Sequence, residues 1–223
     1  MREALTAGVV IELFGTDAAL TRHGDLALQA PRVSAVDEEA LSALTETVQP
    51  QGLVAVCEQF DVTLREALAK RPRLVAVVAE IRDPGNAGTV LRTADAAGAS
   101  AVIFAGDAVD PYNGKCVRAS AGSLFHVDVV RTGPAVVDDL REAGLQTLAT
   151  SGYGADDLDS LLDDGSLAGP TAWIFGSEAH GLPRDVLDAA DRRVRVPIYG
   201  GAESLNLAAA AAVCLYASAR AHR

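Results

Sequence analysis

Three polar loops, each directly after an apolar run typical of a strand, carry residue types that chemistry needs. In the first, the turn Asp83-Pro84-Gly85 leads into a helical segment in which Asn86, Thr89 and Arg92 recur at three-residue spacing. Side chains at this spacing share roughly one helix face, and a guanidinium suits planar contacts with phosphate. An Asn at a helix start is also common as a cap, and an Arg further along as a surface charge.

The second loop runs from Gly176 to Pro183 and follows the apolar run at 171–175. Gly176 has no side chain and therefore lets a ligand approach the backbone. Glu178 lies in the zone beyond a strand end where catalytic groups concentrate. Glu178 and His180 are a conceivable metal pair, but no third ligand follows at the usual spacing, so we expect no metal site.

The third loop joins the strand-like run that contains Val194 to an alanine-rich helix at 205–220. Ser204 is the predicted N-cap of that helix. The alanines permit close approach of another backbone. None of the loops has the glycine pattern of a dinucleotide-binding site, which argues against an oxidoreductase with a nucleotide cofactor.

Strands and helices alternate in the part of the chain that must position these loops. Strands are predicted at 74–79, 101–104, 125–130, 145–149, 171–175 and 193–197, and helices at 87–97, 134–143, 183–190 and 205–220. This alternation predicts an α/β domain with a mainly parallel sheet. Ligands of such sheets bind in loops beyond the carboxyl ends of the strands.

The first 70 residues predict a separate small α/β unit. Strands are expected at 9–14 and 52–57, and helices at 37–46, with Asp37 as N-cap, and at 62–69. Pro72 stops the last helix within a polar stretch, which gives predicted domains of 1–70 and 71–223. The acidic stretch at 156–164 is predicted to be a solvated loop or helix face.

Composition narrows the function classes. The net charge of −11 argues against a protein that coats nucleic acid non-specifically, because such binding neutralises phosphates with Lys and Arg. We expect no membrane span and no signal peptide. Cys57, Cys116 and Cys214 are far apart and form no C-x-x-C pair, so we expect reduced thiols, which fits a cytoplasmic protein.

The three loops resemble, in order and at suitable spacing, the signature motifs of the SpoU (TrmH-like) family of RNA 2′-O-ribose methyltransferases. Motif one corresponds to Asp83-Pro-Gly-Asn-Ala-Gly with Arg92, and motif two to Ile174-Phe-Gly-Ser-Glu-Ala-His-Gly-Leu. Motif three corresponds to Val196-Pro-Ile-Tyr-Gly with Ser204-Leu-Asn206. A stretch at 117–125 resembles a further segment common in these enzymes. The resemblance covers about residues 74–220.

The resemblance implies the SPOUT fold, in which the C-terminal segment threads a loop of the α/β domain to make a trefoil knot. Threading is nearly absent from proteins, so periodicity does not predict it. The knot would form the S-adenosylmethionine pocket. The family also works as a homodimer, with motif one of one subunit near the cofactor of the other. The residues implied to line the pocket are Gly176, Val196, Leu205, Ile198 and Thr150.

The implied reaction is attack of a ribose 2′-oxygen on the methyl carbon of the cofactor. The target is RNA rather than DNA, because DNA lacks that hydroxyl. The family's proposed base corresponds to Arg92, but a free guanidinium stays protonated, so stabilisation of the developing alkoxide is an equally good role. Arg118 is a candidate contact to RNA phosphate. The residues implied to order Arg92 and the ribose are Asn86, Glu178, Ser204 and Asn206.

The first 70 residues resemble, less specifically, the RNA-binding domain similar to ribosomal protein L30e that precedes many SpoU catalytic domains. A further strand usually precedes the helix that here starts at Arg2, so the domain is shortened relative to the family pattern. Either the native start lies upstream of Met1, the chain has been trimmed, or this member has a reduced domain. Such domains accompany many ribosomal RNA enzymes, which favours ribosomal over transfer RNA. The alternative is a non-catalytic RNA-binding or ribosome-assembly protein, and retention of the motif residues argues against it. The sequence selects no particular nucleotide and supports no drug-resistance role.

Overall fold

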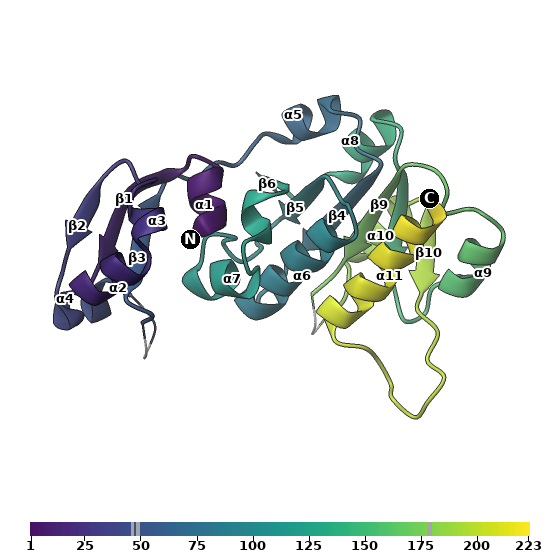
Figure 1. Ribbon diagram of the computed structural model, residues 1–223. Coiled ribbons are helices and arrows are strands. Elements are labelled where there is room, and N and C mark those ends of the chain that lie inside the picture. The colour runs from purple at the N-terminus through teal and green to yellow at the C-terminus, as the bar shows by residue number, and fades with distance from the viewer. Residues whose placement is uncertain (46, 48–49, 178–179) are drawn as a thin grey trace. The chain divides into compact units, whose positions relative to one another are not determined.

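The computed structural model describes residues 1–45, 47, 50–177 and 180–223. The chain divides into two compact units, Met1–Phe60 and Asp61–Arg223, each with its own sheet (Figure 1). The division therefore lies at Phe60 rather than near Lys70, because α5 (Leu64–Ala69) packs in the core of the second unit. Ala67 is buried there, and Lys70 Nζ binds the carboxylate of Asp128 at 2.7 Å.

The first unit is a small α/β structure, as its pattern predicts. Its sheet has the order β2-β1-β3, with β2 parallel and β3 antiparallel to β1. Leu13 and Leu41 are buried in its core. Asp37 caps α4 as predicted, because its Oδ1 accepts the N–H of Ala40 at 2.7 Å. The elements are α1 (Arg2–Thr6), β1 (Val10–Gly15), α2 (Asp17–Arg22), α3 (Gly24–Ala27), β2 (Val33–Ala35), α4 (Glu38–Leu44) and β3 (Leu53–Cys57).

The second unit contains a seven-stranded sheet with the order β6-β5-β4-β9-β7-β10-β8. All pairings in this sheet among the described residues are parallel, which confirms the predicted sheet type. Parallel strands place their carboxyl ends at one edge, so the loops that follow β4, β7, β9 and β10 share that edge. The strands are β4 (Leu74–Ala79), β5 (Ala101–Ala105), β6 (Asp128–Thr132), β7 (Gln146–Thr150), β8 (Asp156–Asp157), β9 (Thr171–Phe175) and β10 (Arg192–Arg195).

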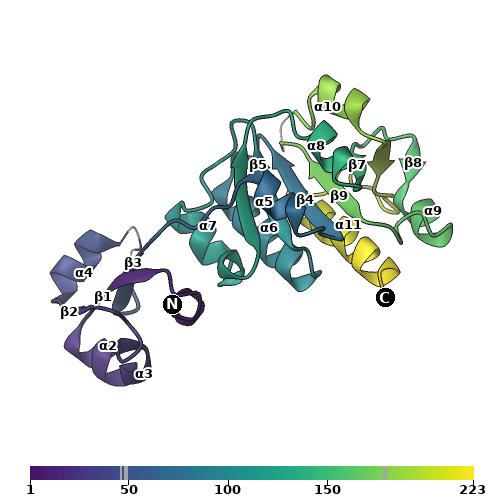
Figure 2. The ribbon, with the colours of Figure 1, turned by 90° about the horizontal axis from the view of Figure 1, so that it is seen from above.

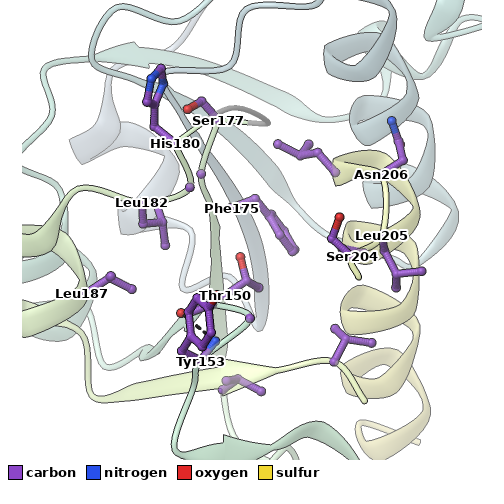
Figure 3. Close-up of a pocket in the computed structure, with 18 of the residues that line it drawn as sticks. Thr150, Tyr153, Phe175, Ser177, His180, Leu182, Leu187, Ser204, Leu205 and Asn206 are labelled. Carbon is purple, nitrogen blue, oxygen red and sulfur yellow. Dashed lines mark hydrogen bonds between the residues drawn. The ribbon is translucent and has the colours of Figure 1, made fainter. Parts of the chain in front are cut away.

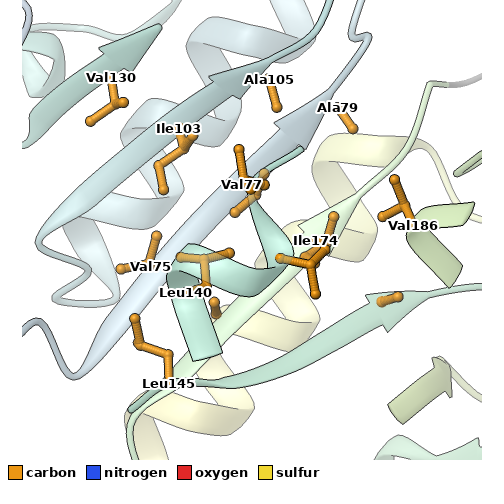
Figure 4. Close-up of a cluster of buried hydrophobic side chains, with 14 of the residues drawn as sticks. Val75, Val77, Ala79, Ile103, Ala105, Val130, Leu140, Leu145, Ile174 and Val186 are labelled. Carbon is orange, nitrogen blue, oxygen red and sulfur yellow. The ribbon is translucent and has the colours of Figure 1, made fainter. Parts of the chain in front are cut away.

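Helices cover both faces of this sheet (Figure 2). On one face α6 (Pro84–Ala96) and α11 (Leu207–Ala221) pack on β4 and on each other, with α7 (Gly114–Ala119) and α9 (Leu158–Asp163) beside them. The other face carries α5, α8 (Val137–Glu142) and α10 (Arg184–Ala189) over the buried cluster of Figure 4. Because both faces are covered, β4 and β9 are buried along their whole length, and all of their residues except Thr171 are apolar.

Several boundaries differ from the sequence predictions. The strand expected at 125–130 begins at Asp128, because Phe125 closes a short 3-10 helix (Ser123–Phe125). The acidic stretch, predicted to be a solvated loop or helix face, forms β8 and the helix α9, which Asp157 caps and which buries Leu158 and Leu161. Cys116 and Cys214 are buried and Cys57 is half-buried, all as free thiols. Among the described helices, none combines the length and apolar character required to cross a bilayer.

Candidate active site

A cavity of about 680 Å³ opens at the carboxyl ends of β7, β9 and β10 (Figure 3). This volume is in the range of pockets that enclose small molecules, and its walls mix apolar side chains with a few polar groups, as such pockets do. The structure places all five residues predicted for the cofactor in these walls. They are Thr150, Gly176, Val196, Ile198 and Leu205.

The turn after β9 depends on the missing side chain of Gly176. A Cβ at this position would lie 2.2 Å from the carbonyl carbon of Gly181, which is far inside van der Waals contact. The backbone closes here because Ser177 N donates to Gly181 O at 3.1 Å and Gly181 N donates to Ser177 O at 2.9 Å. The backbone of Gly181 therefore occupies the space beside Gly176 that was predicted to admit a ligand. Glu178 lies outside the described residues.

The loop after β7 forms a second wall and is held from two sides. Thr150 Oγ1 donates to the carbonyl of Ile174 on β9 at 3.0 Å, and Ser151 N donates to Val194 O on β10 at 2.9 Å. A Cβ on Gly154 would lie 2.5 Å from Arg193 O, so this loop passes directly against the β10 backbone. Tyr153 stands fully exposed among the lining residues (Figure 3).

The loop between β10 and α11 forms the third wall. Asn206, and not Ser204, caps α11, because its Oδ1 accepts the N–H groups of Ala208 at 2.9 Å and Ala209 at 3.3 Å. The predicted cap was wrong because the helix begins at Leu207 rather than at Leu205. Ser204 and Leu205 are thereby left in the loop, where both line the cavity.

Motifs one and three meet through two asparagines. Asn206 Nδ2 donates to Asn86 Oδ1 at 3.2 Å. Asn86 is not the cap of α6; Asp83 is, and its Oδ1 accepts the N–H of Asn86 at 2.9 Å. That hydrogen bond and the Lys115 ammonium, 3.0 Å from Asp83, lower the pKa of the Asp83 carboxyl. The side chain of Asn86 is thus turned toward the third motif.

Arg92 and Arg118 lie outside the cavity walls. Both are exposed, on α6 and α7 respectively, and neither has an ion-pair partner among the described residues. The two helices pack closely at Gly88, where a Cβ would lie 2.3 Å from Cys116 O. One chain therefore gathers Asn86, Asn206 and the pocket residues, but it does not bring either arginine into the pocket.

Comparison with known proteins decides the family. Residues 73–216 match the SpoU rRNA Methylase family. The chain belongs to this family. The match begins one residue before β4 and ends within α11, so it spans almost the whole second unit and all three walls of the cavity.

Relatives and solved structures agree with this assignment. The chain is 39% identical to the 23S rRNA (guanosine(2553)-2′-O)-methyltransferase RlmP of Bacillus subtilis (strain 168), over 81% of this chain and 70% of the relative. The SpoU methyltransferase AviRb from Streptomyces viridochromogenes, solved with the cofactor AdoMet, has a TM-score of 0.85 and 30% identity over 98% of this chain and 86% of its own. An AdoMet-bound rRNA methyltransferase from Sinorhizobium meliloti has a TM-score of 0.81 and 29% identity, over 99% and 85%.

Sequence reasoning missed part of this SpoU family pocket. Phe175, Leu182 and Leu187 form apolar wall, and Glu203 adds a carboxylate. Apolar residues next to a strand are usually core, so their types alone give no signal for a pocket. Phe175 and Leu182 lie inside motif two, and Glu203 directly precedes Ser204 of motif three, so their place in or beside the motifs was the available signal.

Proposed function

We propose that this SpoU family protein transfers the methyl group of S-adenosylmethionine to a ribose 2′-hydroxyl of ribosomal RNA. The observation that carries the proposal is the cavity of about 680 Å³ whose walls come from motifs two and three and from the loop after β7. Its rim is joined to motif one by the Asn206–Asn86 hydrogen bond. The names of the relatives support the substrate class, since RlmP methylates a ribose of 23S rRNA.

The cavity fits the cofactor in size and in chemistry. Backbone groups at Gly176 and Val196 would hold its polar parts, while Leu205, Ile198 and Phe175 give apolar surface. The bound cofactor supplies an electrophilic methyl group on a sulfonium. The protein's own task is to orient the ribose oxygen in line with that methyl group and to exclude water.

Arg92 acts on the ribose oxygen in this proposal. Its guanidinium stabilises the negative charge that develops as the hydroxyl loses its proton, and it does so while remaining protonated itself. Asn86, Ser204 and Asn206 order the arginine and the ribose, and Glu178 takes part in the same task. Because Arg92 is exposed and does not line the cavity of its own chain, its target would lie in a second subunit.

We therefore propose a homodimer in which Arg92 of one subunit faces the cofactor of the other. The exposed side of α11 supports this arrangement, since Val213 and Tyr216 present apolar surface there at three-residue spacing. Arg118, on the helix next to α6, would contact RNA phosphate. The first unit, which resembles ribosomal protein L30e, would bind RNA. A ribosomal RNA substrate favours a cytoplasmic location for the enzyme.

The test is transfer of labelled methyl from S-adenosylmethionine to unmodified ribosomal and transfer RNA, with Arg92→Ala as the control. We expect label on ribosomal RNA from the wild type and none from the variant. A methylated 2′-oxygen also protects the adjacent phosphodiester from alkali, so the label should stay in alkali-resistant dinucleotides. Label on a base would refute ribose methylation. Cofactor binding without transfer to any RNA would favour a non-catalytic RNA-binding protein.

A further inference from the structure

The cavity wall carries one charge that the proposed chemistry has not used. Glu203, in the loop between β10 and α11, is the only carboxylate among the described lining residues, and no Lys or Arg is among them. Its side chain is exposed and has no ion-pair partner among the residues that the structure describes. The described walls therefore present a net negative charge to a bound molecule at neutral pH.

This charge matches a difference between the methyl donor and its product. S-adenosylmethionine carries a sulfonium, an ammonium and a carboxylate, so its net charge is positive. S-adenosylhomocysteine lacks the sulfonium charge and is neutral overall. The ammonium and the carboxylate are present in both molecules, so a carboxylate in the cavity wall can distinguish the two only through the sulfonium charge that the methyl donor alone carries.

We propose that Glu203 is a specificity-determining residue that favours the cationic methyl donor over the neutral product. This inference rests on the proposed placement of the cofactor in the cavity. During transfer the bond from sulfur to the methyl carbon would break with its electron pair left on sulfur, while the ribose oxygen would form the new bond to carbon and lose its proton to solvent water. The positive charge that Glu203 attracts is thereby lost, and the product leaves more readily.

The position of Glu203 supports this role over that of a surface charge. It directly precedes Ser204 and stands three residues before Asn206, so it belongs to the segment that meets motif one at Asn86. Its exposure limits the strength of the interaction, because water screens the charge. A screened charge pair at several ångströms corresponds to roughly threefold to tenfold in affinity.

The experiment measures the Kd of S-adenosylmethionine and of S-adenosylhomocysteine by calorimetry for the wild type, Glu203→Gln, Glu203→Asp and Glu142→Gln. Glu142 is the matched control, an exposed glutamate at the end of α8 outside the cavity. We expect Glu203→Gln to bind the methyl donor roughly threefold to tenfold more weakly and the product almost unchanged. Glu203→Asp and Glu142→Gln should keep the wild-type preference. Added salt should reduce the preference of the wild type but not that of Glu203→Gln.

Two results would overturn the inference. An equal loss of both ligands would mean that Glu203 contacts a group they share, and an unchanged preference would mean that it does not sense the sulfonium. Leu205→Arg separates these results from an error in the proposed site. If that variant binds the methyl donor as the wild type does, the cofactor lies elsewhere, whatever Glu203 does.

Discussion

The cavity proposed for the cofactor and the surface of α6 and α7 that carries Arg92 and Arg118 differ in how far a single chain completes them. The walls of the pocket are held together within one chain by backbone contacts, such as those between Ser177 and Gly181 and between Ser151 and Val194. Arg92 and Arg118 are exposed on helices whose packing is fixed, yet they line no described part of the pocket. We therefore expect cofactor binding to be a property of one subunit, and methyl transfer to require a second subunit and RNA.

Arg92→Ala should give the largest effect. Removal of the group that stabilises the developing alkoxide should lower transfer by about a hundredfold to a thousandfold. The Kd of S-adenosylmethionine should stay within about twofold, because Arg92 lies outside the cavity of its own chain. Radiolabel transfer and calorimetry measure the two quantities, with Arg184→Ala, an exposed arginine on α10, as the matched control. Equal loss of binding and transfer would refute the assigned role.

Leu205→Arg should weaken cofactor binding, which Arg92→Ala should leave almost unchanged. Leu205 lines the cavity and is 39% exposed, so arginine places bulk and positive charge where a cationic cofactor must bind. We expect the Kd of S-adenosylmethionine to rise by at least about tenfold, since a cation repels the sulfonium and disturbs the apolar wall. Leu28→Arg, at an exposed leucine of the first unit, is the control for the added charge. Unchanged affinity would show that the pocket is misplaced.

A mixture of these two variants tests whether the arginine acts across a dimer. In a mixed dimer, the Leu205→Arg subunit supplies an intact Arg92 to the intact pocket of the Arg92→Ala subunit. Random exchange between two-fold symmetric dimers makes half of them mixed, each with one complete site, so activity should recover to about a quarter of the wild type. No recovery, with subunit exchange shown by mass spectrometry, would place Arg92 and its target cofactor in the same chain.

Elements of the fold that depend on local sequence could be predicted, whereas contacts between distant segments could not. The strands at Leu74–Ala79 and Thr171–Phe175 could be predicted to the residue, because both faces of each strand are buried and the sequence is apolar throughout, apart from Thr171. The position of α5 could not, since a short helix beside a polar stretch gives no sign of the sheet that it packs against. Only the structure shows that Ala67 of α5 packs in the core of the second unit.

The residues of the candidate site could also be predicted only in part. The family resemblance points to Thr150, Gly176 and Leu205, and these three residues line one cavity. Ser204 and Asn206 are both good caps by type, so sequence alone cannot choose between them. Leu205 misleads further, because it continues the apolar pattern of α11 but lies in the loop and lines the pocket. The trefoil knot stays a prediction from the resemblance, since threading depends on the path of the whole chain.

The smallest expected effect concerns α6, the helix that carries Arg92. Asp83→Ala removes the cap of α6 and the ion pair with Lys115, and the free energy of unfolding of the second unit should fall by about 1 kcal/mol. Trp173, the one tryptophan in the chain, is buried in that unit, so its fluorescence reports this transition. Asp37→Ala removes a cap of the same type from α4 in the first unit and is the matched control.

The pH dependence of this difference has a definite sign. The fold lowers the pKa of Asp83 below its ordinary value of 3.8, through the N–H of Asn86 and the Lys115 ammonium. The ionised carboxylate therefore stabilises the fold above that value, and the contribution is lost as the pH falls through the lower, folded pKa. The gap between wild type and Asp83→Ala should be full near pH 7 and shrink below about pH 4. A difference that persists in acid would mean that Asp83 stabilises α6 through packing rather than through its charge. The position of Arg92 on α6 would then depend on the close packing of α6 against α7 at Gly88.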